Sequence, residues 1–224
     1  MDIRNKKACC ISLWQAFFMM VDTILFDFGG VLLDLDYTRT YDAMQGLLGC
    51  ELDLSEGSRH RKVLDEYEKG LMSSENFLWH LQHWTDRSLP VPDAPTLIKA
   101  WNAMLLGWRP EKLQLLSDLK KSHRLFLLSN TNALHLEWVH RDLATNHGIR
   151  DFENRFFENA FYSHVLKDRK PNISCFEQVV SLGNIAPSRT LFIDDNESNI
   201  ETAAGLGFQT HLHPANASLE FLRS

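Results

Sequence analysis

The sequence predicts an α/β protein in which a parallel sheet is covered by helices on both faces and a helical segment is inserted after the first strand. Short apolar runs alternate with helical patterns before residue 37 and after residue 107, and this alternation is typical of parallel βαβ units. The runs are apolar at nearly every position, as expected of strands buried on both faces. Residues 37–107 contain no strand-like run, so we expect them to be all-helical.

The individual elements follow from hydrophobic spacing and from helix-capping residues. Residues 23–26 form the first apolar run and predict the first strand. Apolar residues at helical spacing then predict helices at 37–48, 58–69, 74–84, 96–106 and 111–121. The rest of the chain predicts strands at 125–128, 160–163, 190–193 and 208–212, separated by helices at 132–146, after Pro171 and at 197–206. Strands that alternate with helices in this way are expected to be joined by right-handed crossovers.

These patterns divide the chain into a core, an insert and an N-terminal extension. We expect residues 20–36 and 108–224 to form the core and residues 37–107 to form a helical cap. Residues 1–19 contain basic residues followed by an apolar stretch, which is the composition of a secretory signal. The stretch lacks a small-residue cleavage site and is shorter than the ~20 residues that span a bilayer. We therefore interpret it as an extension, and we expect no membrane association.

Charge and cysteine content exclude several classes of partner. The net charge is −6 and the chain has no run of Lys or Arg, whereas a protein that binds nucleic acid needs a basic face. The four cysteines show no metal-ligand spacing, and the adjacent pair Cys9 and Cys10 is a poor disulfide framework. Reduced thiols predict a cytoplasmic location. The sequence gives no indication of an oligomeric state.

Asp27 is the most informative residue because it directly follows the first apolar run. The carboxyl end of a strand faces the ligand crevice in an open α/β sheet. Gly29 and Gly30 follow, and glycines allow the backbone to approach a ligand closely. A carboxylate in this place can act as a covalent nucleophile in phosphoryl transfer. Taken alone, the patch could equally be a turn with a capping aspartate.

Three further polar patches occupy corresponding places. Ser129 and Asn130 follow the second core strand, and Asp194 and Asp195 follow a later one. Lys170 lies just before a proline that can begin a helix. Each patch has a purely structural alternative, namely a helix cap, a solvated lysine or a solvated acidic turn. Because the strand ends share one edge of the sheet, the sequence predicts that these residues meet in one site.

Taken together, the four patches resemble the motifs of the haloacid dehalogenase superfamily of aspartate-nucleophile hydrolases. Asp27 matches the first motif, Ser129 the second, Lys170 the third and the pair Asp194–Asp195 the fourth. The resemblance covers nearly all of the chain after residue 20. Within the superfamily, the sequences Leu-Ser-Asn-Thr-Asn at 128–132 and Phe-Ile-Asp-Asp-Asn at 192–196 are similar to a branch of sugar-phosphate phosphatases that includes the bacterial glucose-1-phosphatase-like proteins.

The resemblance implies a Rossmann-like core, a helical cap that closes over the site, and a role for each motif residue. Asp27 would attack phosphorus and form an aspartyl-phosphate, while Lys170 would contact both Asp27 and the phosphate. The Ser129 hydroxyl and the Asn130 backbone N–H would bind the phosphate. A Mg²⁺ ion would be held by Asp27, the Gly29 carbonyl and Asp195, with Asp194 either a further ligand or an orienting group. The implied partner is a small phosphorylated metabolite, and sugar phosphates are the expected class.

One position departs from the common pattern of the superfamily. Many of its phosphatases carry a second Asp two residues after the nucleophile as general acid and base, and here that residue is Gly29. Proton transfer by a positioned side chain is worth roughly 10²- to 10⁴-fold in rate. Two alternatives to a phosphatase therefore stay open. One is a metal-free dehalogenase, which the acid pair Asp194–Asp195 disfavours, and the other is a binding or regulatory protein that has lost turnover.

Overall fold

The structure is a computed structural model that describes residues 21–223, so the N-terminal extension expected at residues 1–19 lies outside the described residues. Its core is a five-stranded sheet with the order β5-β4-β1-β6-β7, in which every neighbouring pair is parallel. The strands are β1 (Thr23–Phe26), β4 (Arg124–Ser129), β5 (Asn159–Tyr162), β6 (Thr190–Asp194) and β7 (Gln209–Leu212). All five strands expected from the apolar runs are present, and the predicted fold class is confirmed.

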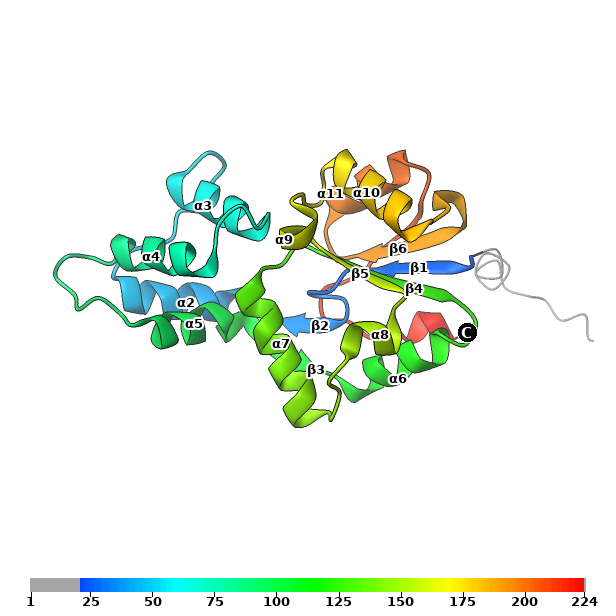
Figure 1. The fold of residues 1–224 in the computed structure, drawn as a ribbon, viewed down its shortest axis with the longest axis horizontal. Helices are drawn as coiled ribbons and strands as arrows, with labels where there is room; N and C mark the ends of the chain where they lie inside the picture. The colour runs from blue at the N-terminus through cyan, green and yellow to red at the C-terminus, as the bar shows by residue number, and fades with distance from the viewer. Residues whose placement is uncertain (1–20, 224) are drawn as a thin grey trace, which may run out of the picture.

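Helices cover both faces of the sheet (Figure 1). Successive residues of a strand point to opposite faces, so Leu25 packs in one apolar cluster while Ile24 and Phe26 pack in the other. The Leu25 cluster includes residues from α10 (Ile173–Gly183) and α11 (Glu197–Gly205). The other cluster includes residues from α6 (Pro110–Leu119), α7 (Ala133–Asn146) and α8 (Phe152–Phe156). The short helices α8 and α9 (Ser163–Leu166) were not expected from the sequence.

A cap of four helices lies beyond the carboxyl ends of the core strands (Figure 1). The helices are α2 (Tyr37–Leu48), α3 (Arg59–Glu68), α4 (Ser74–Trp84) and α5 (Ala94–Trp101). They enclose an apolar cluster of their own, in which the rings of Tyr67 and Phe77 stack at 4.1 Å. Leu134 of α7 joins this cluster, so the cap packs directly on the core.

The cap is joined to the core through two short antiparallel strands that the sequence did not predict. β2 (Leu33–Leu35) pairs with β3 (Leu105–Trp108). Residues 105–107 were expected to lie in the helical insert, but α5 ends at Trp101 and a 3₁₀ turn, Asn102–Met104, leads into β3. The helical spacing of the apolar residues is overridden here by pairing with a segment about 70 residues earlier, and tertiary context commonly overrides local propensity in this way. The exact division at residues 107 and 108 stays a prediction.

None of the helices in the described part of the chain is long and apolar enough to cross a membrane. Cys50 and Cys175, the cysteines within residues 21–223, are both free thiols.

Candidate active site

The register of the sheet brings three motif residues together at one edge. Phe26 of β1 is opposite Leu127 of β4 on one side and Ile193 of β6 on the other. Asp27 immediately follows β1 and its backbone N–H donates to the Ile193 carbonyl. Ser129 and Asp194 are the last residues of the two flanking strands. The predicted site residues on these strands are therefore neighbours in space.

Lys170 joins the site from the loop before α10. Its side chain is only 1% exposed, and its Nζ lies 2.6 Å from Asp27 Oδ1 and 2.6 Å from Asp194 Oδ2. It also donates to the Leu128 carbonyl at 2.9 Å. Burial alone would lower the pKa of Lys170, but the Asp194 and Asp27 carboxylates outweigh burial and raise it. The lysine is therefore a fixed ammonium group that lies between two carboxylates.

The site carries an excess of negative charge. Asp27, Asp194 and Asp195 each offer a carboxylate oxygen, and these oxygens lie within 4.8 Å of one another. Burial raises the pKa of Asp27, and Asp194 and Asp195 raise it further, while Lys170 opposes the shift. When all three carboxyls are ionised, they exceed the single ammonium by two negative charges, which would repel an incoming phosphate. The clustered oxygens are the donor type that a hard divalent cation such as Mg²⁺ prefers, so the residues present fit such an ion.

The two adjacent aspartates differ in their surroundings. Asp194 is fully buried, and its oxygens accept hydrogen bonds from Lys170, from Asn199 Nδ2 and from the Asn196 backbone N–H. Asp195 is half-buried and lines the cavity at the site; burial raises its pKa and the neighbouring Asp194 carboxylate adds to the shift. The Asp194 oxygens are thus occupied by donors from the protein, whereas the Asp195 carboxylate lies at the cavity, where a cation can bind.

Position 30 favours glycine for two reasons, its backbone conformation and its closeness to Asp195. Its φ angle is +77°, in the region that residues with a Cβ rarely adopt. A Cβ at this position would also lie 2.2 Å from Asp195 Oδ2. The turn after Asp27 therefore leaves room for the carboxylate that faces the cavity.

The side chain of Asn130 holds the lysine loop in place. Its Nδ2 donates to the Lys170 carbonyl at 2.9 Å, and its Oδ1 accepts from the Lys170 backbone N–H at 3.0 Å. This side chain is therefore structural, and only the Asn130 backbone remains for a ligand.

Ser129 is buried at the floor of the site. Asn132 caps α7 by accepting from the His135 backbone N–H, so the helix cap that the structural alternative assigned to Ser129 and Asn130 is supplied by a later residue.

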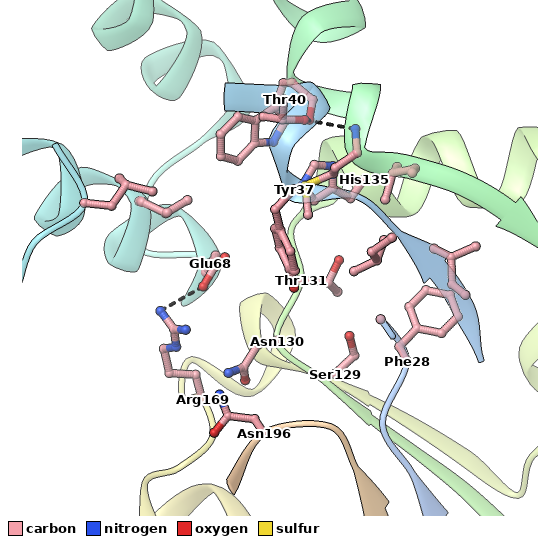
Figure 2. Close-up of a pocket in the computed structure, with 18 of the residues that line it drawn as sticks. Phe28, Tyr37, Thr40, Glu68, Ser129, Asn130, Thr131, His135, Arg169 and Asn196 are labelled. Carbon is pink, nitrogen blue, oxygen red and sulfur yellow. Dashed lines mark hydrogen bonds and ion pairs between the residues drawn. The ribbon is translucent and has the colours of Figure 1, made fainter. Parts of the chain in front are cut away.

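A cavity of about 310 Å³ opens between the site and the cap. It contains Asp27, Gly29, Ser129, Asn130, Lys170 and Asp195. The cavity is also lined by side chains that were not expected from the sequence. They include Tyr37 and Glu68 of the cap, and Arg169 and His135 of the core (Figure 2).

Two of these additional residues can be described from their contacts. His135 is stacked on Trp101 at 5.2 Å, its Nδ1 is 2.7 Å from Asn102 Oδ1, and burial lowers its pKa to about 3, so the ring is neutral. Tyr37 extends from the start of α2 into the cavity (Figure 2). Tyr37 is 55% exposed, and partial desolvation together with the negative charges of Asp27 and Asp195 raises its pKa. Its neutral hydroxyl therefore lies within electrostatic reach of the acid cluster.

Comparison with known proteins assigns the chain to a family. The family model described as haloacid dehalogenase-like hydrolase matches residues 21–207. The D-ribitol-5-phosphate phosphatase of Bacteroides thetaiotaomicron is 30% identical over 200 residues, which cover 89% of this chain and 94% of the relative.

Solved structures of the same family share the fold over almost the whole chain. A HAD family enzyme from Bacteroides thetaiotaomicron, solved in complex with magnesium and inorganic phosphate, is 28% identical with a TM-score of 0.81, covering 91% of this chain and all of the other. A predicted HAD-like family hydrolase from Porphyromonas gingivalis is 26% identical with a TM-score of 0.76, covering 90% and 94% of the two chains. The protein therefore belongs to the haloacid dehalogenase-like hydrolases, as its four motif patches predicted.

Proposed function

We propose that the protein is a Mg²⁺-dependent phosphatase that hydrolyses small phosphorylated metabolites, with sugar and polyol phosphates as the substrate class. The observation that carries this proposal is the position of Asp27, which is held by Lys170 beside the other two carboxylates and lines the cavity under the cap. The similarity to a D-ribitol-5-phosphate phosphatase supports the substrate class, as does the size of the cavity.

Asp27 would act as the nucleophile in a two-step reaction. One of its carboxylate oxygens attacks phosphorus, the bond to the leaving oxygen breaks, and an aspartyl-phosphate forms. Water then hydrolyses this acyl phosphate and regenerates the carboxylate. Because the transferring group carries negative charge on three oxygens, it needs positive charge and N–H donors around it. Lys170, the Ser129 hydroxyl and the Asn130 backbone N–H would supply them.

The metal would be held by Asp27, Asp195 and the Gly29 carbonyl. When bound, Mg²⁺ would offset the excess negative charge of the carboxylates, so that the phosphate can approach. Asp194 would orient the site indirectly, because its oxygens are already occupied by Lys170, Asn199 and the backbone. Closure of the cap excludes bulk water, which strengthens these electrostatic interactions.

The test is a screen of phosphate esters with purified protein, in Mg²⁺ and in excess chelator. Metal-dependent release of inorganic phosphate from sugar or polyol phosphates is the expected result. A dehalogenase would instead release halide from a 2-haloacid without a metal. The charge excess at Asp27, Asp194 and Asp195 disfavours that activity, because a halocarboxylate is itself an anion.

The glycine at position 29 leads to a prediction about leaving groups. Without a carboxyl at this position the leaving oxygen departs with more negative charge, so the rate should depend steeply on leaving-group acidity. Aryl phosphates and anomeric sugar 1-phosphates are expected to react faster than plain alkyl phosphates. The measurement is log k against leaving-group pKa, under conditions where the first chemical step limits the rate. A flat plot would show that another residue supplies the proton.

A substitution that introduces a carboxyl at position 29 tests the same dependence on leaving-group acidity. Gly29→Asp should flatten the dependence, because the new carboxyl can protonate the departing oxygen. A Cβ at position 29 would lie 2.5 Å from Leu35 Cδ1, so the end of that side chain must move. The double variant Gly29→Asp/Leu35→Ala removes this clash and serves as the second measurement.

A further inference from the structure

The last residue of cap helix α3 presents a carboxylate to the catalytic cavity. Glu68 lines the same cavity as Asp27, and its side chain is 18% exposed. Its Oε2 is buried 2.8 Å from Arg169 Nη1 (Figure 2). Its Oε1 makes no hydrogen bond or ion pair within residues 21–223. Oε1 is therefore the oxygen that a bound molecule can reach.

The core fixes the position of this carboxylate. The Glu68 backbone carbonyl accepts a hydrogen bond from Ser163 Oγ at 2.6 Å, and the Gly70 carbonyl accepts one from Lys167 Nζ at 2.6 Å. Arg169, which pairs with Glu68, directly precedes Lys170, which pairs with Asp27. Consecutive residues are only about 3.8 Å apart along the chain. One short segment thus sets the spacing between the nucleophile and the carboxylate on the cap.

The charges on this side of the cavity balance. Arg61 pairs with Asp65 on α3, and Arg169 pairs with both Asp65 and Glu68. Two positive and two negative side chains leave no net charge, and burial lowers the pKa of the nearby His60, which keeps that ring neutral. This side of the cavity carries no net charge, and its Glu68 Oε1 atom can accept hydrogen bonds from hydroxyl groups. It offers no uncompensated positive charge to a second phosphate or carboxylate.

We propose that Glu68 is a specificity-determining residue that accepts a hydrogen bond from a hydroxyl of the leaving group, while Arg169 holds its carboxylate in position. The preferred substrates are then monophosphates of uncharged polyhydroxylated molecules, and bisphosphates are excluded by the carboxylate. This inference rests on the phosphatase activity proposed above and assigns the substrate recognition of the same site.

The experiment compares substrates that do and do not reach Glu68. The probes are phenyl phosphate, whose leaving group has no further hydroxyl, a panel of ribitol 5-phosphate, ribose 5-phosphate and glucose 1-phosphate, and ribulose 1,5-bisphosphate. The variants are Glu68→Ala and the shape-conserving Glu68→Gln. Glu66→Ala is the matched control, because Glu66 lies on the same helix but is exposed and does not line the cavity.

In Glu68→Ala, kcat/KM for the best hydroxylated monophosphate should fall about 10- to 100-fold, as for loss of a hydrogen bond to a charged group. For phenyl phosphate, kcat/KM of the same variant should change by less than about threefold. The ratio of kcat/KM for ribulose 1,5-bisphosphate to that for the monophosphate should rise, because Arg169 loses part of its compensating charge. Glu68→Gln should show the same changes with smaller amplitude, and Glu66→Ala should match the wild type.

Equal losses for phenyl phosphate and for the hydroxylated substrates would mean that Glu68 only holds the cap, and would overturn the inference. A Glu68→Ala variant that keeps the wild-type kcat/KM for every member of the panel would also overturn it, while the phosphatase activity would stand. If no phosphate ester is hydrolysed in Mg²⁺, the proposed function itself fails.

Discussion

Asp27→Asn is expected to lower kcat for every phosphate ester by roughly 10⁴-fold or more, as for loss of a nucleophile. The amide retains the shape of the carboxylate but cannot form the acyl phosphate. The fold should survive, because Lys170 keeps its ion pair with Asp194 and its hydrogen bond to the Leu128 carbonyl. Steady-state release of inorganic phosphate measures the effect, and thermal unfolding of the same sample checks the fold.

The matched control for this substitution is Asp22→Asn. Asp22 lies just before the opposite end of β1, where it pairs with Arg189, and it does not line the cavity. Its loss should leave kcat unchanged. A complementary measurement is rapid acid quenching of the wild type during turnover, followed by mass spectrometry, which should find phosphate on the peptide that contains Asp27. Near-wild-type turnover of Asp27→Asn would refute the covalent mechanism.

Removal of divalent metal is expected to abolish turnover, and added Mg²⁺ should restore it. The reason is the charge of the site, where three carboxylates face one ammonium and leave two negative charges in excess. A phosphate cannot approach this cluster without a compensating cation. Asp195→Ala should not be rescued at ordinary Mg²⁺ concentrations, because Asp195 is the acid of the pair whose carboxylate lines the cavity. The measurement is kcat/KM as a function of free Mg²⁺.

Glu197→Ala is a suitable control for the metal experiment. Glu197 lies two residues after Asp195, at the exposed start of α11, and does not line the cavity. Its Mg²⁺ dependence should match that of the wild type. Undiminished turnover in excess chelator would contradict a metal site and would favour the dehalogenase alternative, which release of halide from a 2-haloacid would then check.

The sequence was sufficient for the parallel core and for the order of the motif residues, because both depend on local signals. Strands buried on both faces need apolar residues at successive positions, and residues 125–128 and 190–193 satisfy this without reference to the rest of the chain. Helix starts were predictable for the same reason. Ser73, for example, caps α4 by accepting from the Asn76 backbone N–H three residues later. Polar residues at the ends of parallel strands must share one edge, which places Asp27, Ser129 and Asp194 together.

The tertiary structure alone decided the features that depend on contacts between distant segments. β3 forms because β2 is present to pair with it, and nothing within residues 105–108 signals a strand. The different roles of Asp194 and Asp195 depend on where Lys170 and Asn199 lie around them.

The cap residues of the cavity belong to the same category. Glu68 and Tyr37 have no motif around them and become part of the site only because the cap lies over the core. Arg169 had one signal in the sequence, its position next to Lys170, but its partners Asp65 and Glu68 are about 100 residues away. Spacing along a chain determines which face of a helix or strand a residue occupies. The packing of one element against another determines which of those faces form a site.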